Sequence, residues 1–123
     1  MKIPTAAALL FAAMPLHADG ILAVLKNPNT IERRDAQSGA FKGSISVNNA
    51  IGVGCDGETL AVLLAGGSIA RYDAKTGAFR GSISLSGKPS AIQVNGGVIA
   101  VTTGSGMNRY NAKTGAFMGS SSF

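Results

Sequence analysis

Short apolar runs alternate with turn residues along most of the chain, and this pattern predicts an all-β fold. The clearest runs are LAVL, LAVLL and IAV, which begin at Leu22, Leu60 and Ile99. Runs of this length, separated by Gly, Asn, Ser and Asp, are typical of strands. Because the apolar residues are consecutive rather than alternating, we expect each run to be a strand that is covered on both faces.

One turn motif recurs and divides the chain into copies of a single unit. The sequence DAQSGAFKGSI begins at Asp35, DAKTGAFRGSI at Asp73 and NAKTGAFMGSS at Asn111. Each step is 38 residues, close to the period of about 40–45 residues that is typical of four-stranded propeller blades. The chain is therefore predicted to contain three repeats.

The first and fifth residues of the turn motif have structural roles. The Asp or Asn side chain accepts backbone N–H groups two or three residues further on. The glycine supplies the positive φ that closes the turn. These turn residues are Asp35, Gly39, Asp73, Gly77, Asn111 and Gly115. Each motif also carries a phenylalanine that we expect to pack between adjacent repeats, at Phe41, Phe79 and Phe117.

Each repeat is predicted to contain four antiparallel strands. In the second repeat they cover residues 50–55, 59–64, 68–73 and 78–85. In the third they cover residues 91–95, 98–103, 107–111 and 116–122. Asp56-Gly57 and Asn95-Gly96 are strong hairpin signals between the first two strands.

The segment IARYDAKTG, from Ile69 to Gly77, resembles the Tyr/Leu-Asp-Ala-x-Thr-Gly turn of quinoprotein-like (PQQ-like) β-propeller repeats. A looser similarity links it to the YVTN type. The resemblance extends over residues 20–123 and implies three four-stranded propeller blades. Propellers close with about 4–8 blades, so a partial propeller, or one completed by oligomerisation, is implied. The chain has no Trp, whereas Trp commonly follows the turn glycine in quinoprotein repeats, and the Trp-Asp signature of WD40 repeats is missing too.

Residues 1–18 have two interpretations. Lys2, the apolar stretch at 6–13 and Leu16-His17-Ala18 before a cleavage point predict a secretory signal peptide, which would leave a domain of residues 19–123 in the periplasm or outside the cell. Alternatively, residues 13–20 align with residues 50–57, since both segments end in Asp-Gly. Residues 13–18 would then form the first strand of the first repeat.

The composition limits the chemistry that the chain can perform. The formal net charge is +5, but the basic residues are spaced by the repeat, which favours a solvated basic surface over a nucleic-acid site. Cys55 is the only cysteine, and we expect a buried, inert thiol. No membrane span is expected after the signal segment.

These observations favour a non-catalytic binding or scaffold module. Arg and Tyr are frequent interface anchors, and both recur on the third strand of the repeats. The candidate contact residues are Arg33, Arg71, Arg109, Tyr72 and Tyr110. The competing interpretation is that these side chains only occupy the third strand of each blade and bind no partner.

An enzyme is the alternative. A quinone-dependent dehydrogenase needs a stacking Trp and clustered carboxylates, and a lyase or lactonase needs His or paired acids. The one histidine is His17, in the segment that the signal peptidase would remove. We therefore predict no catalytic residue, metal site or cofactor, unless the chain is a fragment or subunit of a larger propeller enzyme of the quinoprotein-like or lactonase/lyase type.

Three blades leave two blade faces uncovered, and uncovered apolar faces promote association. We therefore expect the chain to associate, either with a second copy to give a ring of six blades or with a protein partner that supplies the missing blades.

Overall fold

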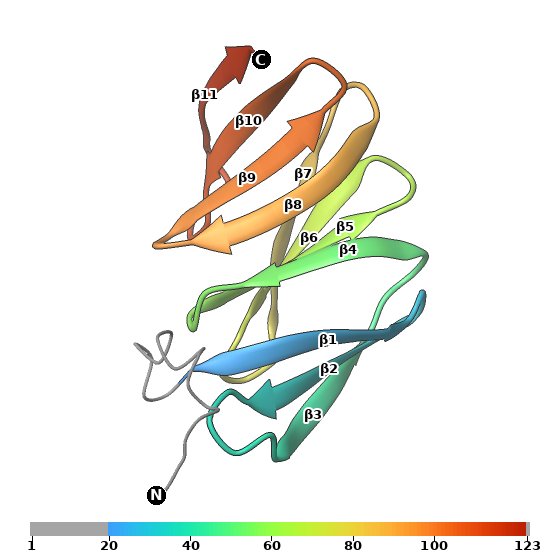
Figure 1. Ribbon diagram of the computed structural model, residues 1–123, viewed down its shortest axis with the longest axis vertical. Coiled ribbons are helices and arrows are strands. Elements are labelled where there is room, and N and C mark those ends of the chain that lie inside the picture. Colours follow the sequence, from blue (N-terminus) through green and yellow to red (C-terminus); the bar gives the residue numbers. More distant parts are fainter. Residues whose placement is uncertain (1–19, 123) are drawn as a thin grey trace, which may run out of the picture.

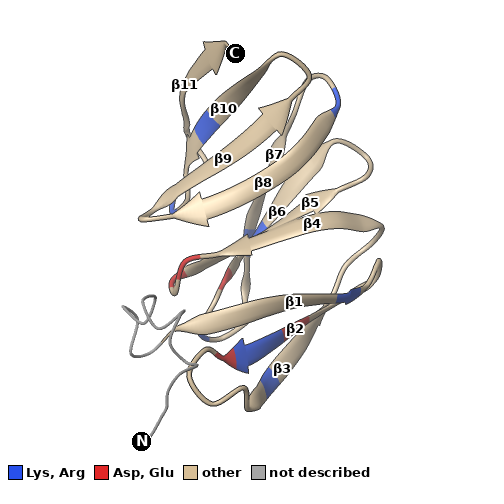
Figure 2. Cartoon of the chain, viewed as in Figure 1, with Lys and Arg blue, Asp and Glu red and all other residues tan. Residues whose placement is uncertain are grey.

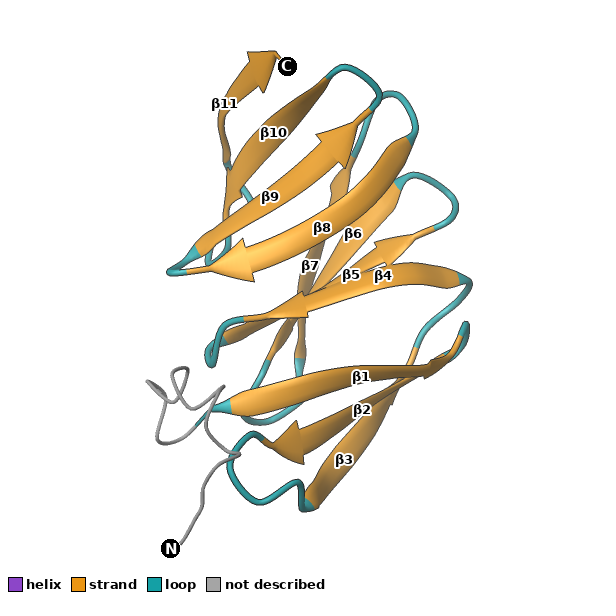
Figure 3. Ribbon diagram, in the orientation of Figure 1, coloured by secondary structure: helices purple, strands orange, loops and turns teal. Residues whose placement is uncertain are grey.

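The computed structural model describes residues 20–122, and these form antiparallel sheets joined by loops (Figures 1 and 3). Blade 1 contains β1 (Ile21–Asn27), β2 (Thr30–Asp35) and β3 (Phe41–Ser46). Blade 2 contains β4 (Ala50–Cys55), β5 (Thr59–Leu64), β6 (Ser68–Asp73) and β7 (Phe79–Ser84). Blade 3 contains β8 (Pro89–Asn95), β9 (Val98–Thr103), β10 (Gly106–Asn111) and β11 (Phe117–Ser122).

Blades 2 and 3 confirm the predicted four-stranded unit. Each has its strands hydrogen-bonded in chain order, and every pairing is antiparallel. The bounds of β4, β5, β6 and β9 agree with the predicted ranges. The all-β expectation is confirmed as well.

Blade 1 has three strands among the described residues. Its β1 corresponds to β5 and β9, the second strands of the other blades, because the turn motif that begins at Asp35 follows it as Asp73 follows β5. The segment 13–18, for which both a signal peptide and a first strand were predicted, lies outside the described residues.

The blades are stacked side by side and meet along one edge. There β4 lies beside β1 on one side and beside β8 on the other (Figure 1). Two apolar clusters fill the spaces between the blades, one between blades 1 and 2 and one between blades 2 and 3. A radial stack of this kind buries apolar residues mainly between neighbouring sheets.

Strand β5 shows why its sequence is continuously apolar. Leu60 and Val62 belong to the cluster shared with blade 1, and Ala61 and Leu63 belong to the cluster shared with blade 3. All four side chains are fully buried. The expectation of a strand covered on both faces is therefore confirmed for the middle blade.

The turn motif has the predicted geometry in every blade. The Oδ1 atom of Asp35 accepts the N–H groups of Gln37 and Ser38 at 2.8 and 2.9 Å. These hydrogen bonds lower the pKa of Asp35, the one from Ser38 most strongly. The fifth residue has φ values of 78°, 81° and 81° at Gly39, Gly77 and Gly115. The same Oδ1 contacts recur at Asp73 and Asn111.

The phenylalanines of the motif do not pack between blades, and this prediction was wrong. Phe41, Phe79 and Phe117 are 57%, 63% and 61% exposed. Each phenylalanine is the first residue of the last strand of its blade and lies next to a β-bulge: the register of β3 shifts between the partners of Arg33 and Arg34, which are Gly43 and Phe41. An extra residue in one strand moves the preceding side chain to the other face of the sheet.

Candidate functional site

The guanidinium group of Arg33 joins blade 1 to blade 2. Arg33 lies on β2 and is buried. Its Nη1 donates to the carbonyl oxygens of Ala74 and Lys75, at 3.3 and 2.9 Å, in the turn motif of blade 2. Its Nη2 donates to the carbonyl of Lys42 in its own blade, at 3.1 Å. One side chain therefore connects the outer hairpin of one blade to the turn of the next.

Arg71 makes the same contact between blades 2 and 3. Its Nη1 donates to the carbonyls of Ala112 and Lys113 at 3.2 and 2.9 Å. Its Nη2 donates to the carbonyl of Arg80 at 3.2 Å. The donor nitrogens and the acceptor carbonyls are equivalent to those around Arg33, so the contact recurs with the repeat.

Two glycines provide the space for each arginine. A Cβ atom on Gly43, which has a φ of 140°, would lie 2.5 Å from Nη2 of Arg33. A Cβ atom on Gly77 of the next blade would lie 3.1 Å from Nε of the same arginine. A side chain at either position would displace the guanidinium. The corresponding glycines around Arg71 are Gly81 and Gly115.

Arg109 occupies the same position on β10 at the end of the stack. Arg109 is half-buried. Its Nη2 lies against Gly119, since a Cβ atom there would lie 2.8 Å from it. The distance is the same between Gly81 and Nη2 of Arg71. No carbonyl among residues 20–122 accepts a hydrogen bond from Arg109: no described blade follows blade 3, and the carbonyl of Met118, which corresponds to that of Arg80, is not engaged either. Of the three candidate contact arginines, this is the one at an open face.

The two candidate tyrosines contact phenylalanines of their own blades and also the apolar clusters between blades: Tyr110 belongs to the cluster between blades 2 and 3, and Tyr72 packs against the one between blades 1 and 2. Tyr72 and Phe79 meet edge to face with ring centroids 5.5 Å apart, and Tyr110 and Phe117 do so at 5.6 Å. Burial raises the pKa of Tyr72, and Tyr110 is more deeply buried than Tyr72. In both pairs the exposed ring is the phenylalanine.

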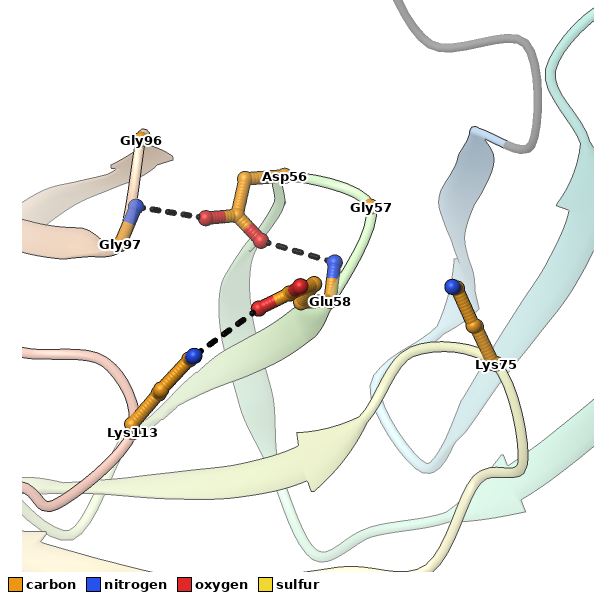
Figure 4. Close-up of a pocket in the computed structure, with 7 residues that line it drawn as sticks. All are labelled: Asp56, Gly57, Glu58, Lys75, Gly96, Gly97 and Lys113. Carbon is orange, nitrogen blue, oxygen red and sulfur yellow. Dashed lines mark hydrogen bonds and ion pairs between the residues drawn. The ribbon is translucent and has the colours of Figure 1, made fainter.

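A pocket of about 400 Å³ opens where the loops of blades 2 and 3 meet (Figure 4). It is lined by Asp56, Gly57, Glu58, Lys75, Gly96, Gly97 and Lys113. Lys113 reaches across to Glu58 with an Nζ–Oε1 distance of 3.6 Å. Both side chains are exposed, and such pairs contribute at most about 1 kcal/mol. The pocket therefore presents a charged surface and no buried reactive group.

Asp56 in this pocket is a second link between blades 2 and 3. Its Oδ1 accepts the N–H groups of Glu58 and Thr59 at 3.0 and 2.9 Å, and its Oδ2 accepts that of Gly97 at 2.8 Å. Burial acts to raise the pKa of Asp56, but the hydrogen bonds from Thr59, Glu58 and Gly97 outweigh it and hold the pKa below its ordinary value. The sequence alone indicated only a hairpin turn at Asp56.

The remaining chemistry is sparse. Cys55 is half-buried, and burial raises the pKa of its thiol, which makes the nucleophilic thiolate rarer. Among residues 20–122, no cluster of three His, Cys, Asp or Glu side chains could hold a metal ion. The same residues contain no helix long and apolar enough to cross a bilayer. Lysines and arginines are scattered over the strands and loops rather than gathered in one run (Figure 2).

The arginine contact predicts the effect of a substitution at Arg71. We expect Arg71→Met to lower the free energy of unfolding by about 2 kcal/mol, because three backbone carbonyls lose a charged donor. Arg80→Met is the matched control, since Arg80 makes only an exposed ion pair with Asp73 and its loss should cost less than about 1 kcal/mol. Urea unfolding at pH 7 measures both. Equal losses would contradict the assigned contact.

Asp56 predicts a pH-dependent effect. Because folding lowers its pKa, the stabilisation is present above the ordinary value of 3.8 and is lost as the pH falls through the folded value. Asp56→Asn keeps one acceptor oxygen but replaces the one that accepts from Gly97. We expect the variant to be about 1 kcal/mol less stable than wild type at pH 7, less than for a fully buried hydrogen bond because solvent screens the site. The difference should narrow as the pH is lowered from 7 to 3.

The control for Asp56→Asn is Asp35→Asn. Asn111 fills the equivalent turn position and accepts the same backbone N–H groups, so we expect a loss below about 0.5 kcal/mol. Urea unfolding at pH 7 and pH 3 compares the two variants. An Asp56→Asn gap that is the same at both pH values would count against the inter-blade hydrogen bond.

No family model and no curated protein matches this sequence. Solved structures do match. BamB from Moraxella catarrhalis has a TM-score of 0.69 and 22% identity, over 86% of this chain and 34% of that one. Apo AztD from Citrobacter koseri has a TM-score of 0.69 and 18% identity, over 86% and 32%. The WD40 repeats of RRP9 have a TM-score of 0.68 and 13% identity, over 84% and 35%.

The chain spans about a third of the length of the solved structures that it matches. Repeats of the WD40 type are propeller blades of four strands, and the strand order and radial stacking described above agree with that architecture. The chain has the β-propeller fold, present as three consecutive blades.

Proposed function

We propose that the chain is a non-catalytic binding module that acts through the open faces of its blade stack. The observation that carries the proposal is the exposure of one apolar position. Leu22, Leu60 and Ile99 occupy the same place in the three repeats, yet Leu22 is 49% exposed while Leu60 and Ile99 are fully buried. Leu60 and Ile99 are covered by the preceding blade, and no described blade precedes blade 1.

The N-terminal open face continues beyond Leu22. Val24 corresponds to Val62, which is fully buried, and is itself only partly buried. Ala36 is exposed, whereas its counterpart Ala74 is fully buried. An apolar surface with the composition of a blade interface is suited to receive another blade.

The alternative is that these blades are part of a larger propeller enzyme. Both proposals require further blades, since the chain covers about a third of the propellers that it resembles. The enzyme alternative would also require the other blades to supply the reactive groups. In the pocket of blades 2 and 3, Glu58 is engaged by Lys113, and Asp56 is engaged by backbone N–H groups. The binding module therefore explains more of the described residues.

We further propose export of the chain to the periplasm or the outside of the cell, on the basis of the signal-like residues 1–18. N-terminal sequencing of the protein isolated from its own cells should then give Asp19 as the first residue. A chain that still begins at Met1 would contradict export by this route. It would favour the strand interpretation of residues 13–18.

Isolation of the full chain from the cells that produce it tests the binding module. Native mass spectrometry of the C-terminally tagged chain should show a stoichiometric polypeptide, either a second copy or another protein. Leu22→Asp should abolish this association, because it places a charge on the apolar face. Ile51→Asp is the matched control, since Ile51 is 51% exposed but lies on the middle blade, and it should retain the association. A chain that stays monomeric at every concentration measured and carries no bound polypeptide would refute the proposal.

A further inference from the structure

The arginine contact between blades has two halves, and each end of the stack carries one of them. Arg33 and Arg71 supply the donor half to the turn motif of the blade that follows. Arg109 supplies a third donor at the C-terminal face. The turn at residues 35–39 supplies a third acceptor at the N-terminal face.

The donor half is preformed at the C-terminal face. Arg109 has the same relation to Gly119 that Arg71 has to Gly81, and the two glycines have φ values of 141° and 130°. The guanidinium thus lies over Gly119 as that of Arg71 lies over Gly81, but without the hydrogen bond to its own blade that Arg71 makes. No described residue accepts a hydrogen bond from Arg109.

The acceptor half is preformed at the N-terminal face. Gly39 has a φ of 78°, close to the 81° of Gly77 and Gly115, so the three turns have the same shape. A Cβ atom on Gly77 or Gly115 would meet an arginine at 3.1 or 3.2 Å, but one on Gly39 would meet no residue of 20–122 within 4 Å. No described arginine fills here the space that one fills in the other blades.

The burial of the second residue of the turn motif, an alanine in every repeat, also indicates that the first turn lacks an arginine from a preceding described blade. Ala74 and Ala112 provide the carbonyls that receive Arg33 and Arg71, and both are fully buried. Ala36, in the same position of the first turn, is exposed. Identical sequence positions are therefore covered where an arginine arrives from the preceding blade and uncovered where none does.

We propose that the partner at these faces is a second copy of this chain, docked head to tail, with Arg109 of one copy bound to the 35–39 turn of the other. The inference rests on the proposed binding role of the open faces and names their occupant. The two contacting surfaces differ, so the contact is heterologous. Two copies bring six blades, within the range of about 4–8 in which propellers close, and both junctions of such a ring are the same contact.

The C-terminal face indicates that this junction is weaker than those inside the chain. Thr102 and Ser121 stand where blade 2 has the apolar Leu63 and Ile83. Leu63 and Ile83 are buried against blade 3. Less apolar surface is removed from water at the junction. The two-copy form therefore dissociates on dilution.

Sedimentation velocity of the full chain over a range of concentrations tests the proposal. We expect a reversible monomer–dimer equilibrium at pH 7. Arg109→Met removes the donor, and Ala36→Arg places a positive charge against Arg109, so each should shift the midpoint concentration at least tenfold upward. Both positions are at open faces, and unchanged circular dichroism spectra would show that the variants fold. Arg80→Met should leave the equilibrium unchanged.

Mixing the two variants tests the head-to-tail arrangement. The Ala36→Arg chain keeps its Arg109, and the Arg109→Met chain keeps its turn, so one intact junction remains between them. We expect the equimolar mixture to form a heterodimer at concentrations where each variant alone is monomeric. A dimer in which like faces pair, C-terminal face with C-terminal face or N-terminal with N-terminal, would not be restored by mixing, and that result would overturn the proposal.

A gain-of-association variant protects the test against misfolding. The double variant Thr102→Leu, Ser121→Ile restores the residue types that blade 2 has at these positions. It should lower the midpoint concentration of dimer formation about tenfold or more. Adding Arg109→Met should raise that midpoint again. A wild-type chain that stays monomeric at all concentrations, or that forms species larger than a dimer, would refute the two-copy ring. If such a monomer still binds another polypeptide in a manner sensitive to Leu22→Asp, the binding module stands and only this inference fails.

Discussion

The stack of blades depends on one contact, in which an arginine binds the turn of the next blade. The guanidinium of Arg33 is buried between sheets, where a charge without partners would be very costly. It is stabilised there by carbonyls that belong to two blades, those of Ala74 and Lys75 on one side and that of Lys42 on the other. Because these acceptors hold positions fixed by separate hairpins, the arginine adds a directional contact to the apolar clusters that fill the spaces between the blades.

This contact links features of the sequence that have no obvious relation to one another. Nη2 of Arg33 lies where a Cβ atom of residue 43 would be, so a glycine is needed there. The same guanidinium lies close to where a Cβ atom of residue 77 would be, so Gly77 is needed as well. The positive φ of Gly77 also closes the turn that presents the carbonyls. The turn motif therefore serves two purposes at once: it ends one hairpin and it forms the receptor for the preceding blade.

The sequence predicted the features that lie within a repeat and missed those that lie between repeats. The Asp-to-Gly turn and the strands of blade 2 follow from local hydrogen bonding and apolar runs, and they were placed nearly to the residue. Strict alternation from Ile45 would put Phe41 on the buried face, but the bulge between Gly43 and Phe41 reverses it. A period of 38 residues shows that Arg33 and Arg71 share a role, yet it carries no information about which blade supplies their partners.

The two ends of the stack have different surfaces, and the difference has a physical reason. The N-terminal face keeps the apolar Leu22 and Val24, whereas the C-terminal face replaces the equivalents of buried Leu63 and Ile83 with Thr102 and Ser121. Arg109 is nevertheless retained, because a guanidinium is well solvated when free and binds carbonyls when docked. Apolar side chains on a free face invite non-specific association. The proposed two-copy contact therefore pairs an apolar N-terminal face with a C-terminal face whose main anchor is polar, and it buries less apolar surface than the contacts inside the chain.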